Sequence, residues 1–178
     1  MAPLPSSTVS SSVSSGRMLA IYLRHHVAAS RGGVDLFHRS ARTQLSNEAR
    51  QELRDLAAEV TQDREQLLRI LARLGVRRPR VAEVLVGVAE TLGRLKPNGT
   101  LVRRSPLSDV MELEALSTAV AAKRLGWVTL RLVGERDGRF DPAEIDALIA
   151  RAEDQQARLE GLRGQAVLGV LAVAGSEH

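Results

Sequence analysis

The chain has 178 residues and no cysteine, which excludes disulfide bonds, zinc–thiolate sites, iron–sulfur clusters and cysteine nucleophiles. Four aromatic residues are too few for a surface that stacks nucleic-acid bases, and no apolar run approaches the ~20 residues that cross a bilayer. The net charge of +4 comes from 25 basic and 21 acidic residues, and every basic residue except Lys96 and Lys123 is arginine. This composition predicts a cytoplasmic, mainly α-helical protein without membrane insertion.

The first sixteen residues, MAPLPSSTVSSSVSSG, are rich in serine and contain two prolines. They hold too little apolar surface to offset the entropy lost on ordering, so we expect residues 1–16 to be a disordered tail. Residues 17–174 are expected to form a single domain. The other four prolines fall between periodic segments, as expected because a proline inside a helix is destabilising by about 3 kcal/mol.

Apolar residues recur at three- and four-residue spacing in four long segments. We predict helices at about 17–42, 47–75, 107–133 and 142–172, with a shorter helix at about 80–95. Ser46 or Asn47 offers an N-cap to the second long helix, and Gly75 offers a C-cap. Asp141 and Pro142 form a capping arrangement at the start of the last helix. The helix at 107–133 is apolar around so much of its circumference that we expect it to be central.

The lengths of the connections predict how these helices are arranged. Short connections after the first and third long helices predict two antiparallel hairpins. The middle connection, residues 76–106, is long enough to return the chain to the opposite end of the bundle. The predicted fold is therefore an all-α, ferritin-like, up-down-down-up four-helix bundle with a short helix in the crossover.

One polar residue interrupts the apolar face of each long helix, and all four stand at similar depth: His26, Asp63, Lys123 and Gln155. We therefore predict a buried polar layer. A lone buried charge would cost several kcal/mol, so Asp63 and Lys123 are expected to pair or to change protonation state. His26 and Gln155 would then satisfy the remaining donors and acceptors.

This layer allows three interpretations. Polar residues at core positions are best known for fixing the register of helices, and this is the interpretation we favour. The layer could instead bind a small ligand or perform proton chemistry, because titratable groups with shifted pKa values cluster at functional sites. In the third interpretation, some of the long side chains reach water.

Three segments resemble a bacterial group of ferritin-like four-helix bundles with degenerate diiron ligands: YLRHHVAASRGGVDLFHRSAR, LRDLAAEVTQDREQL and SPLSDVMELEALSTAVAAKRLGW. The resemblance covers about residues 17–172 and implies the scaffold. Ferritin-like diiron proteins carry two Glu-x-x-His motifs, but the nearest matches here are Glu59-x-x-Gln62 and Glu153-x-x-Gln156. Both lack the histidine, and Lys123 would repel a metal dication. We therefore expect no metal and no cofactor.

Positive charge is concentrated between residues 73 and 104, where eight basic residues face two acidic ones for a local charge of +6. A solvated face needs no partner and is the simpler interpretation. The alternative is weak anion or nucleic-acid binding through a patch formed by Arg77, Arg78, Arg80, Arg103 and Arg104. No aromatic residue occurs in this stretch, which makes nucleic acid an unfavoured partner.

The sequence contains no phosphate-binding glycine loop, GxSxG elbow, HExxH motif or EF-hand loop, and we assign no catalytic residue. The favoured hypothesis is a non-catalytic bundle with a structural or protein-interaction role, which self-associates through the apolar surface of residues 107–133 or binds another protein. The two alternatives are an enzyme or ligand-binding protein that uses the polar layer, and an anion-binding module that uses the arginine patch.

Overall fold

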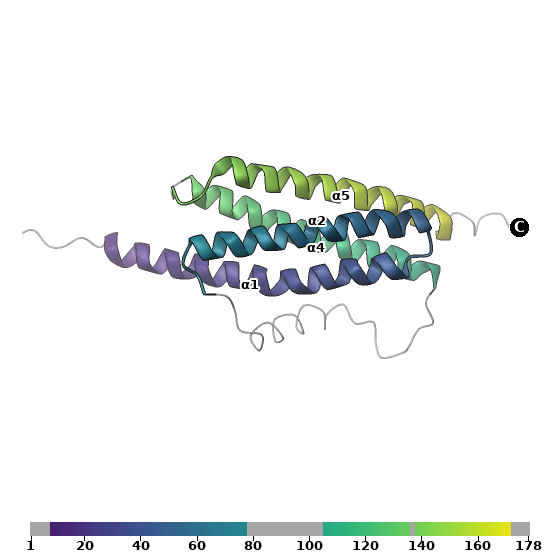
Figure 1. The fold of residues 1–178 in the computed structure, drawn as a ribbon, viewed down its shortest axis with the longest axis horizontal. Coiled ribbons are helices and arrows are strands. Elements are labelled where there is room, and N and C mark those ends of the chain that lie inside the picture. Colours follow the sequence, from purple (N-terminus) through teal and green to yellow (C-terminus); the bar gives the residue numbers. More distant parts are fainter. Residues whose placement is uncertain (1–7, 78–104, 136–137, 172–178) are drawn as a thin grey trace, which may run out of the picture.

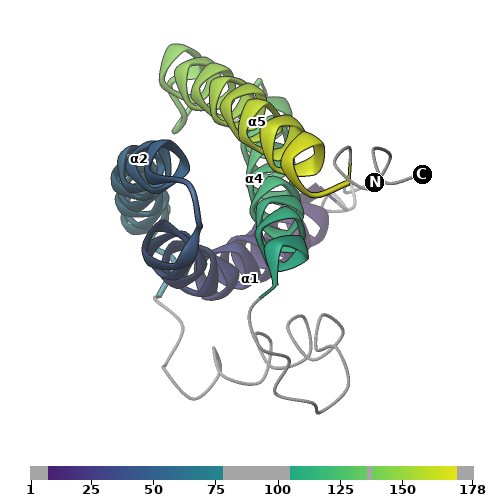
Figure 2. The ribbon, with the colours of Figure 1, turned by 90° about the vertical axis from the view of Figure 1, so that its right-hand side faces the viewer.

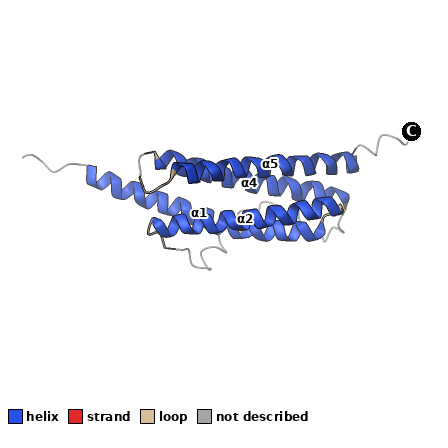
Figure 3. Ribbon diagram, turned by 45° about the horizontal axis from the view of Figure 1, so that its top comes forward, coloured by secondary structure: helices blue, strands red, loops and turns tan. Residues whose placement is uncertain are grey.

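The computed structural model describes residues 8–77, 105–135 and 138–171. Within these ranges every regular element is an α-helix and no strand is present (Figure 3). The helices are α1 (Thr8–Thr43), α2 (Asn47–Arg73), α4 (Pro106–Gly134) and α5 (Pro142–Leu171). The prediction of an all-α protein with four long helices is confirmed in these ranges. The short helix expected at 80–95 lies outside them.

The first helix begins nine residues earlier than the sequence predicted, at Thr8 rather than at Arg17. Residues 8–16 therefore belong to α1 and not to a disordered tail, whereas residues 1–7 lie outside the described part of the chain. The physical reason is cooperativity. Once a helix has nucleated, each further residue adds a hydrogen bond without a second nucleation cost, and no proline lies between Pro5 and Arg17 to stop α1 from extending toward the N-terminus.

The second helix starts and stops at the capping residues seen in the sequence. Ser46 is the N-cap, and its side chain accepts a hydrogen bond from the Ala49 N–H at 3.2 Å. At the other end Gly75 has a φ of +67°, a conformation that favours glycine. The N–H groups of Gly75 and Val76 donate to carbonyls of the last turn, which is the Schellman arrangement. This turn directs the chain after α2 away from the helix axis.

The other two helices also begin at capping residues. The Ser105 N–H donates to the Ser108 hydroxyl at 3.2 Å at the start of α4. At the start of α5, the Asp141 carboxylate accepts a hydrogen bond from the Ala143 N–H at 3.0 Å. Both helices carry proline at their first position, where the missing N–H would have no helical partner. These caps define where the two helices enter the bundle.

The helices form two antiparallel hairpins, α1–α2 and α4–α5, which lie side by side (Figures 1 and 2). Gln44, which follows α1, donates to the carbonyl of Asp109 in the first turn of α4, so α1 and α4 run antiparallel. Gln66, in the last part of α2, bonds to Glu144 in the first turn of α5, so these two helices are antiparallel as well. It follows that α2 and α4 run in the same direction.

Apolar side chains from all four helices fill the space between the hairpins. Fully buried members include Leu23, Phe37, Leu53, Leu56, Leu113, Leu116 and Leu159, and burying each such side chain contributes about 1.5–3 kcal/mol. The expectation that residues 107–133 form a central helix is wrong, because Leu107, Met111, Leu125 and Leu132 of α4 are exposed. Each helix of a four-helix bundle keeps an outer face, and the outer face of α4 is apolar.

Candidate functional site

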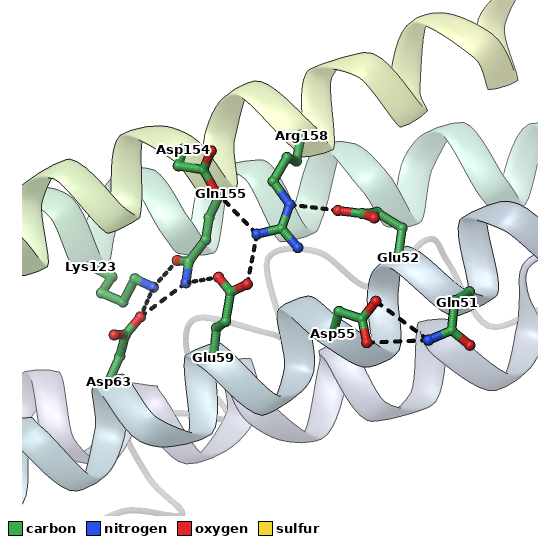
Figure 4. Close-up of polar contacts among 9 residues, drawn as sticks. All are labelled: Gln51, Glu52, Asp55, Glu59, Asp63, Lys123, Asp154, Gln155 and Arg158. Carbon is green, nitrogen blue, oxygen red and sulfur yellow. Dashed lines mark hydrogen bonds and ion pairs between the residues drawn. The ribbon is translucent and has the colours of Figure 1, made fainter.

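Three of the four residues in the predicted polar layer meet in the interior of the bundle (Figure 4). Lys123 Nζ on α4 donates to Asp63 Oδ2 on α2 at 2.5 Å and to Gln155 Oε1 on α5. Gln155 Nε2 also donates to Asp63 Oδ2, at 3.3 Å. Asp63 is 1% exposed and Gln155 is fully buried. We call these three residues the core cluster.

The directions of the helices explain why these residues meet. Asp63 stands sixteen residues after Asn47, the first residue of α2, and Lys123 stands seventeen residues after Pro106, the first residue of α4. Because α2 and α4 run in the same direction and rise equally per residue, the two side chains reach the same height. Both occupy positions on the buried stripe of their helix, so they point toward each other.

Burial is the largest influence on the pKa of Lys123 and lowers it. The charge and hydrogen bond of the Asp63 carboxylate act in the opposite direction, but they do not fully offset the effect of burial. The net lowering means that removing the ammonium from water outweighs its attraction to Asp63, a common result for buried ion pairs. The protonated amine has no lone pair for nucleophilic attack, and its N–H groups are directed to Asp63 and Gln155. The geometry therefore favours a structural pair over a reactive lysine.

A row of charged side chains extends the core cluster along the contact between α2 and α5 (Figure 4). Arg158 on α5 forms ion pairs with Glu59 at 2.7 Å and with Glu52 at 2.5 Å, both on α2. Gln155 Nε2 donates to the other oxygen of Glu59 at 3.0 Å. Burial acts to raise the pKa of Glu59, but the hydrogen bonds from Arg158 and Gln155 outweigh it and lower that pKa.

Sequence reasoning missed this charged row, although a signal was present. Glu52 and Glu59 are seven residues apart on α2, as are Arg151 and Arg158 on α5, so each pair shares one helix face. Arg151 also forms an ion pair with Asp63 Oδ1. The spacing of apolar residues does not mark charged residues that lie beside the apolar stripe of a helix. Opposite charges at matching spacing on two helices would have predicted the row.

His26, the fourth residue of the predicted polar layer, does not join the core cluster. It lies in the contact between α1 and α4. Its ring packs against the Tyr22 ring, with the centroids 4.6 Å apart, and Tyr22 Oη donates to Thr129 Oγ1 on α4 at 3.1 Å. A Cβ atom at Gly126 would stand 3.0 Å from the His26 ring, so glycine is what allows the close approach. Burial, followed by the charge of His25, lowers the pKa of His26.

The incomplete diiron motifs do not converge on a metal site. Glu59 is bonded to Arg158 and Gln155, and Glu153 pairs with Arg124 at 2.6 Å at the surface. Throughout the residues that the structure describes, no three acidic or histidine side chains are grouped so that they could hold a metal ion.

Only Arg77 of the predicted anion-binding patch belongs to the described residues, and it is exposed just beyond the end of α2. Arg78, Arg80, Arg103 and Arg104 lie outside them, so the patch as a whole has no structural description.

The described residues contain no helix whose length and apolarity would allow it to cross a membrane.

Comparison of the chain with protein-family models, with curated proteins and with solved structures gives no match. The interpretation of the site therefore depends on its geometry and charges. The acidic groups at the α2–α5 contact face basic groups of the same chain: Lys123 and Arg151 flank Asp63, and Arg158 flanks Glu59. Each of these acidic groups therefore has a basic partner from the same chain.

Proposed function

We propose that the protein is a non-catalytic, ferritin-like bundle that acts through protein contacts and has no functional diiron site. Two antiparallel hairpins joined by a long connection are typical of ferritin-like topology, and thirty-two residues separate Arg73 from Pro106. In diiron members of that fold, the bundle centre holds glutamates and histidines. Here the corresponding region contains the Lys123 ammonium, whose charge opposes the binding of a dication.

The observation that carries the interaction role is a second apolar stripe on the outer face of α4. Seven residues repeat there at heptad spacing: Met111, Glu114, Thr118, Ala121, Leu125, Val128 and Leu132. We call this set the outer seam. Residues spaced in this way normally pack against a second helix as knobs into holes. Its large members Met111, Leu125 and Leu132 are each about 60% exposed, so the seam lacks a helical partner within the described residues.

The partner we propose is a second copy of the chain, bound with the two α4 helices antiparallel. A two-fold interface brings the same surface of each copy together, and the outer seam has large apolar residues near both of its ends. A parallel pairing would bring the two Glu114 carboxylates together, which is unfavourable although Arg163 of the same chain, 3.9 Å from Glu114, offsets part of the repulsion. An antiparallel pairing instead brings Glu114 to the half of the seam that contains Leu125.

The test is the mass of the full-length protein in solution, measured by light scattering over a range of concentrations. We expect a dimer, and we expect Leu125→Glu to weaken it by about thirtyfold or more, as loss of a central interface residue worth about 2 kcal/mol does. Leu45→Glu is the matched control, since Leu45 lies outside the seam and both leucines are 59% exposed. A monomeric wild type, or equal weakening by the control, would contradict the proposal.

A further inference from the structure

Positive charge is distributed unevenly among the four helices. The first helix, α1, contains five arginines and one aspartate, which gives it a net charge of +4 with histidine counted as neutral. By contrast, α2 contains five basic and six acidic residues, α4 three of each, and α5 three basic and five acidic residues. All the net positive charge of these helices therefore belongs to α1.

Four of the arginines of α1 are exposed and share one face of the helix: Arg17, Arg31, Arg39 and Arg42. Fourteen residues separate Arg17 from Arg31, and eleven separate Arg31 from Arg42, which is close to four and to three turns of about 3.6 residues. Arg39 precedes Arg42 by three residues and so lies beside it. We call these four residues the α1 row. At a rise of about 1.5 Å per residue, the row extends over roughly 37 Å.

The α1 row differs from the arginines of the other helices in having no partner within the described part of the chain. Of the ten arginines in α2, α4 and α5, all except Arg64 bond to a side chain or a carbonyl group of the same chain. No member of the row does so, and Asp35, the one acidic residue of α1, forms an ion pair with none of them. Arg24, the fifth arginine of α1, has a partner and is not counted in the row.

The segments outside the described ranges do not offset this charge. Residues 78–104 contain six basic and two acidic residues, residues 136–137 contain one of each, and residues 172–178 contain one acidic residue. Residues 1–7 contain no charged side chain. Together these segments carry a net charge of +3, so they add to the positive charge of the molecule. A surface of one charge sign attracts ligands of the opposite sign.

The shape of the row suits the phosphate backbone of duplex DNA. A duplex carries one negative charge per ~1.7 Å of its axis, and the roughly 37 Å of the row is close to one helical turn of about 34 Å. Guanidinium groups bind phosphate oxygens in a bidentate manner. An acidic membrane fits less well, because membrane-surface helices have many large apolar residues beside their basic ones. Met18 and Ile21, near one end of the row, are the large apolar residues described as exposed on α1.

The scarcity of aromatic residues limits which nucleic acid this surface can bind. Single strands are held largely by bases stacked on aromatic rings. The two aromatic residues of α1 are not available for stacking, because Phe37 is buried and Tyr22 packs on His26 and bonds to Thr129 of α4. Contacts to the backbone of a duplex need no aromatic side chain.

We propose that the α1 row binds the phosphate backbone of duplex DNA without reading the base sequence. The four guanidinium groups would each contact a phosphate along about one turn of the duplex. This binding activity goes beyond the proposed protein-interaction role. It uses a different helix from the outer seam, so it does not depend on dimer formation.

The experiment is fluorescence anisotropy of a labelled duplex of about 30 base pairs, titrated with the full-length protein at several salt concentrations. We expect a dissociation constant in the micromolar range at about 50 mM salt. Four phosphate contacts predict that the logarithm of the association constant falls with the logarithm of salt concentration with a slope of about −3.6 or steeper. The double variant Arg31→Glu/Arg39→Glu should weaken binding at least tenfold and reduce that slope by about two.

A matched control separates the row from the overall charge of the protein. Arg54→Glu/Arg69→Glu makes the same change of net charge at two exposed positions of α2. We expect it to weaken binding by less than about threefold, because exposed charges beyond the screening length contribute little. Circular dichroism of both double variants checks that the helices are retained.

Three outcomes would overturn the proposal. One is that the duplex does not bind at about 50 mM salt and protein concentrations of about 100 μM. Another is that the control pair on α2 weakens binding as much as the pair in the α1 row. The third is tighter binding of phosphatidylglycerol vesicles or of polyglutamate than of the duplex, since that result would assign the row to a membrane surface or to an acidic protein.

Discussion

The two contacts between the hairpins are built from different chemistry. The α1–α4 contact joins helices whose backbones approach closely, with Gly126 leaving room for the His26 ring and Tyr22 bonded to Thr129. The α2–α5 contact joins more separated backbones, and long charged side chains span the gap. One bundle therefore holds its halves together by small residues on one side and by paired charges on the other.

The α2–α5 side of the bundle carries the larger desolvation cost, because it buries charged groups. Burial lowers the pKa of Lys123 more than the charge and hydrogen bond of Asp63 raise it, so this ammonium loses more by leaving water than it gains from its partner. We expect the core cluster to contribute mainly by specifying which residues face each other. The α1–α4 contact instead depends on how closely the His26 ring fits against Gly126, and a single methyl group added at Gly126 tests that fit.

The largest effect is expected from breaking the core pair on one side only. Lys123→Met leaves the buried Asp63 with only the partly exposed Arg151 as a cationic partner, and we expect a loss of about 3 kcal/mol in the free energy of unfolding. The double variant Asp63→Leu/Lys123→Met should recover most of this loss, because both charges are then absent. Chemical denaturation of the wild type, of Asp63→Leu and Lys123→Met alone, and of the double variant measures the coupling between the two residues.

Arg124→Met provides the control for that cycle, since Arg124 neighbours Lys123 in sequence but pairs with the exposed Glu153. We expect it to lose less than about 1 kcal/mol. If Lys123→Met is as mild as Arg124→Met, the core pair does not carry the role assigned to it.

The next effect concerns the α1–α4 contact and compares two glycines. Gly126→Ala forces a methyl group against the His26 ring, and we expect it to destabilise the protein by about 1 kcal/mol. Gly161→Ala in α5 has open space around the added methyl and should stabilise by up to about 1 kcal/mol, the helix-propensity gain. Thermal or chemical unfolding measures both.

The contact with His26 can be checked in a second background. In a His26→Ala protein, Gly126→Ala should become stabilising, because the ring that opposed the methyl is gone. A penalty that persists in that background would show that some neighbour other than His26 resists the methyl.

A smaller effect is expected from the charged row. Arg158→Met removes two cross-helix ion pairs that are partly solvated. We therefore expect the free energy of unfolding to fall by about 1 kcal/mol, and the difference to shrink as salt is added.

The same variant changes how stability depends on pH. Because the folded-state pKa of Glu59 is below its unfolded value, its share of stability is present above about pH 4.5 and is lost as the pH falls below that. The variant should lose less stability on acidification than the wild type, and denaturation at pH 5 and pH 3 tests this. An equal loss in both proteins would contradict the role of Arg158 in lowering the Glu59 pKa.

The smallest effect is the pH dependence contributed by His26. Its pKa in the folded protein is below the unfolded value of about 6.5, so the unfolded chain takes up a proton first as the pH falls. Stability from this group is therefore present above pH 6.5 and declines below it. His26→Gln should flatten the pH profile of stability between about pH 7 and pH 5, whereas His38→Gln, at an exposed site on the same helix, should not.

Sequence patterns predicted much of this arrangement for identifiable reasons. The ends of α2 follow from Ser46 and Gly75, and the meeting of Asp63, Lys123 and Gln155 follows from interruptions in apolar stripes. The α1 contact of His26 was not predictable, because depth along a helix does not say which neighbour a side chain faces. The early start of α1 was missed because composition alone does not capture how a formed helix extends.

The proposed function depends on the Lys123 ammonium, and not a metal ion, balancing the buried Asp63 carboxylate in the middle of the bundle. The most direct test is elemental analysis of the purified protein from cells supplied with iron and manganese, compared with its Asp63→Asn variant. The account predicts that both proteins contain far less than one metal ion per chain. Near-stoichiometric metal in the wild type that disappears in Asp63→Asn would contradict it.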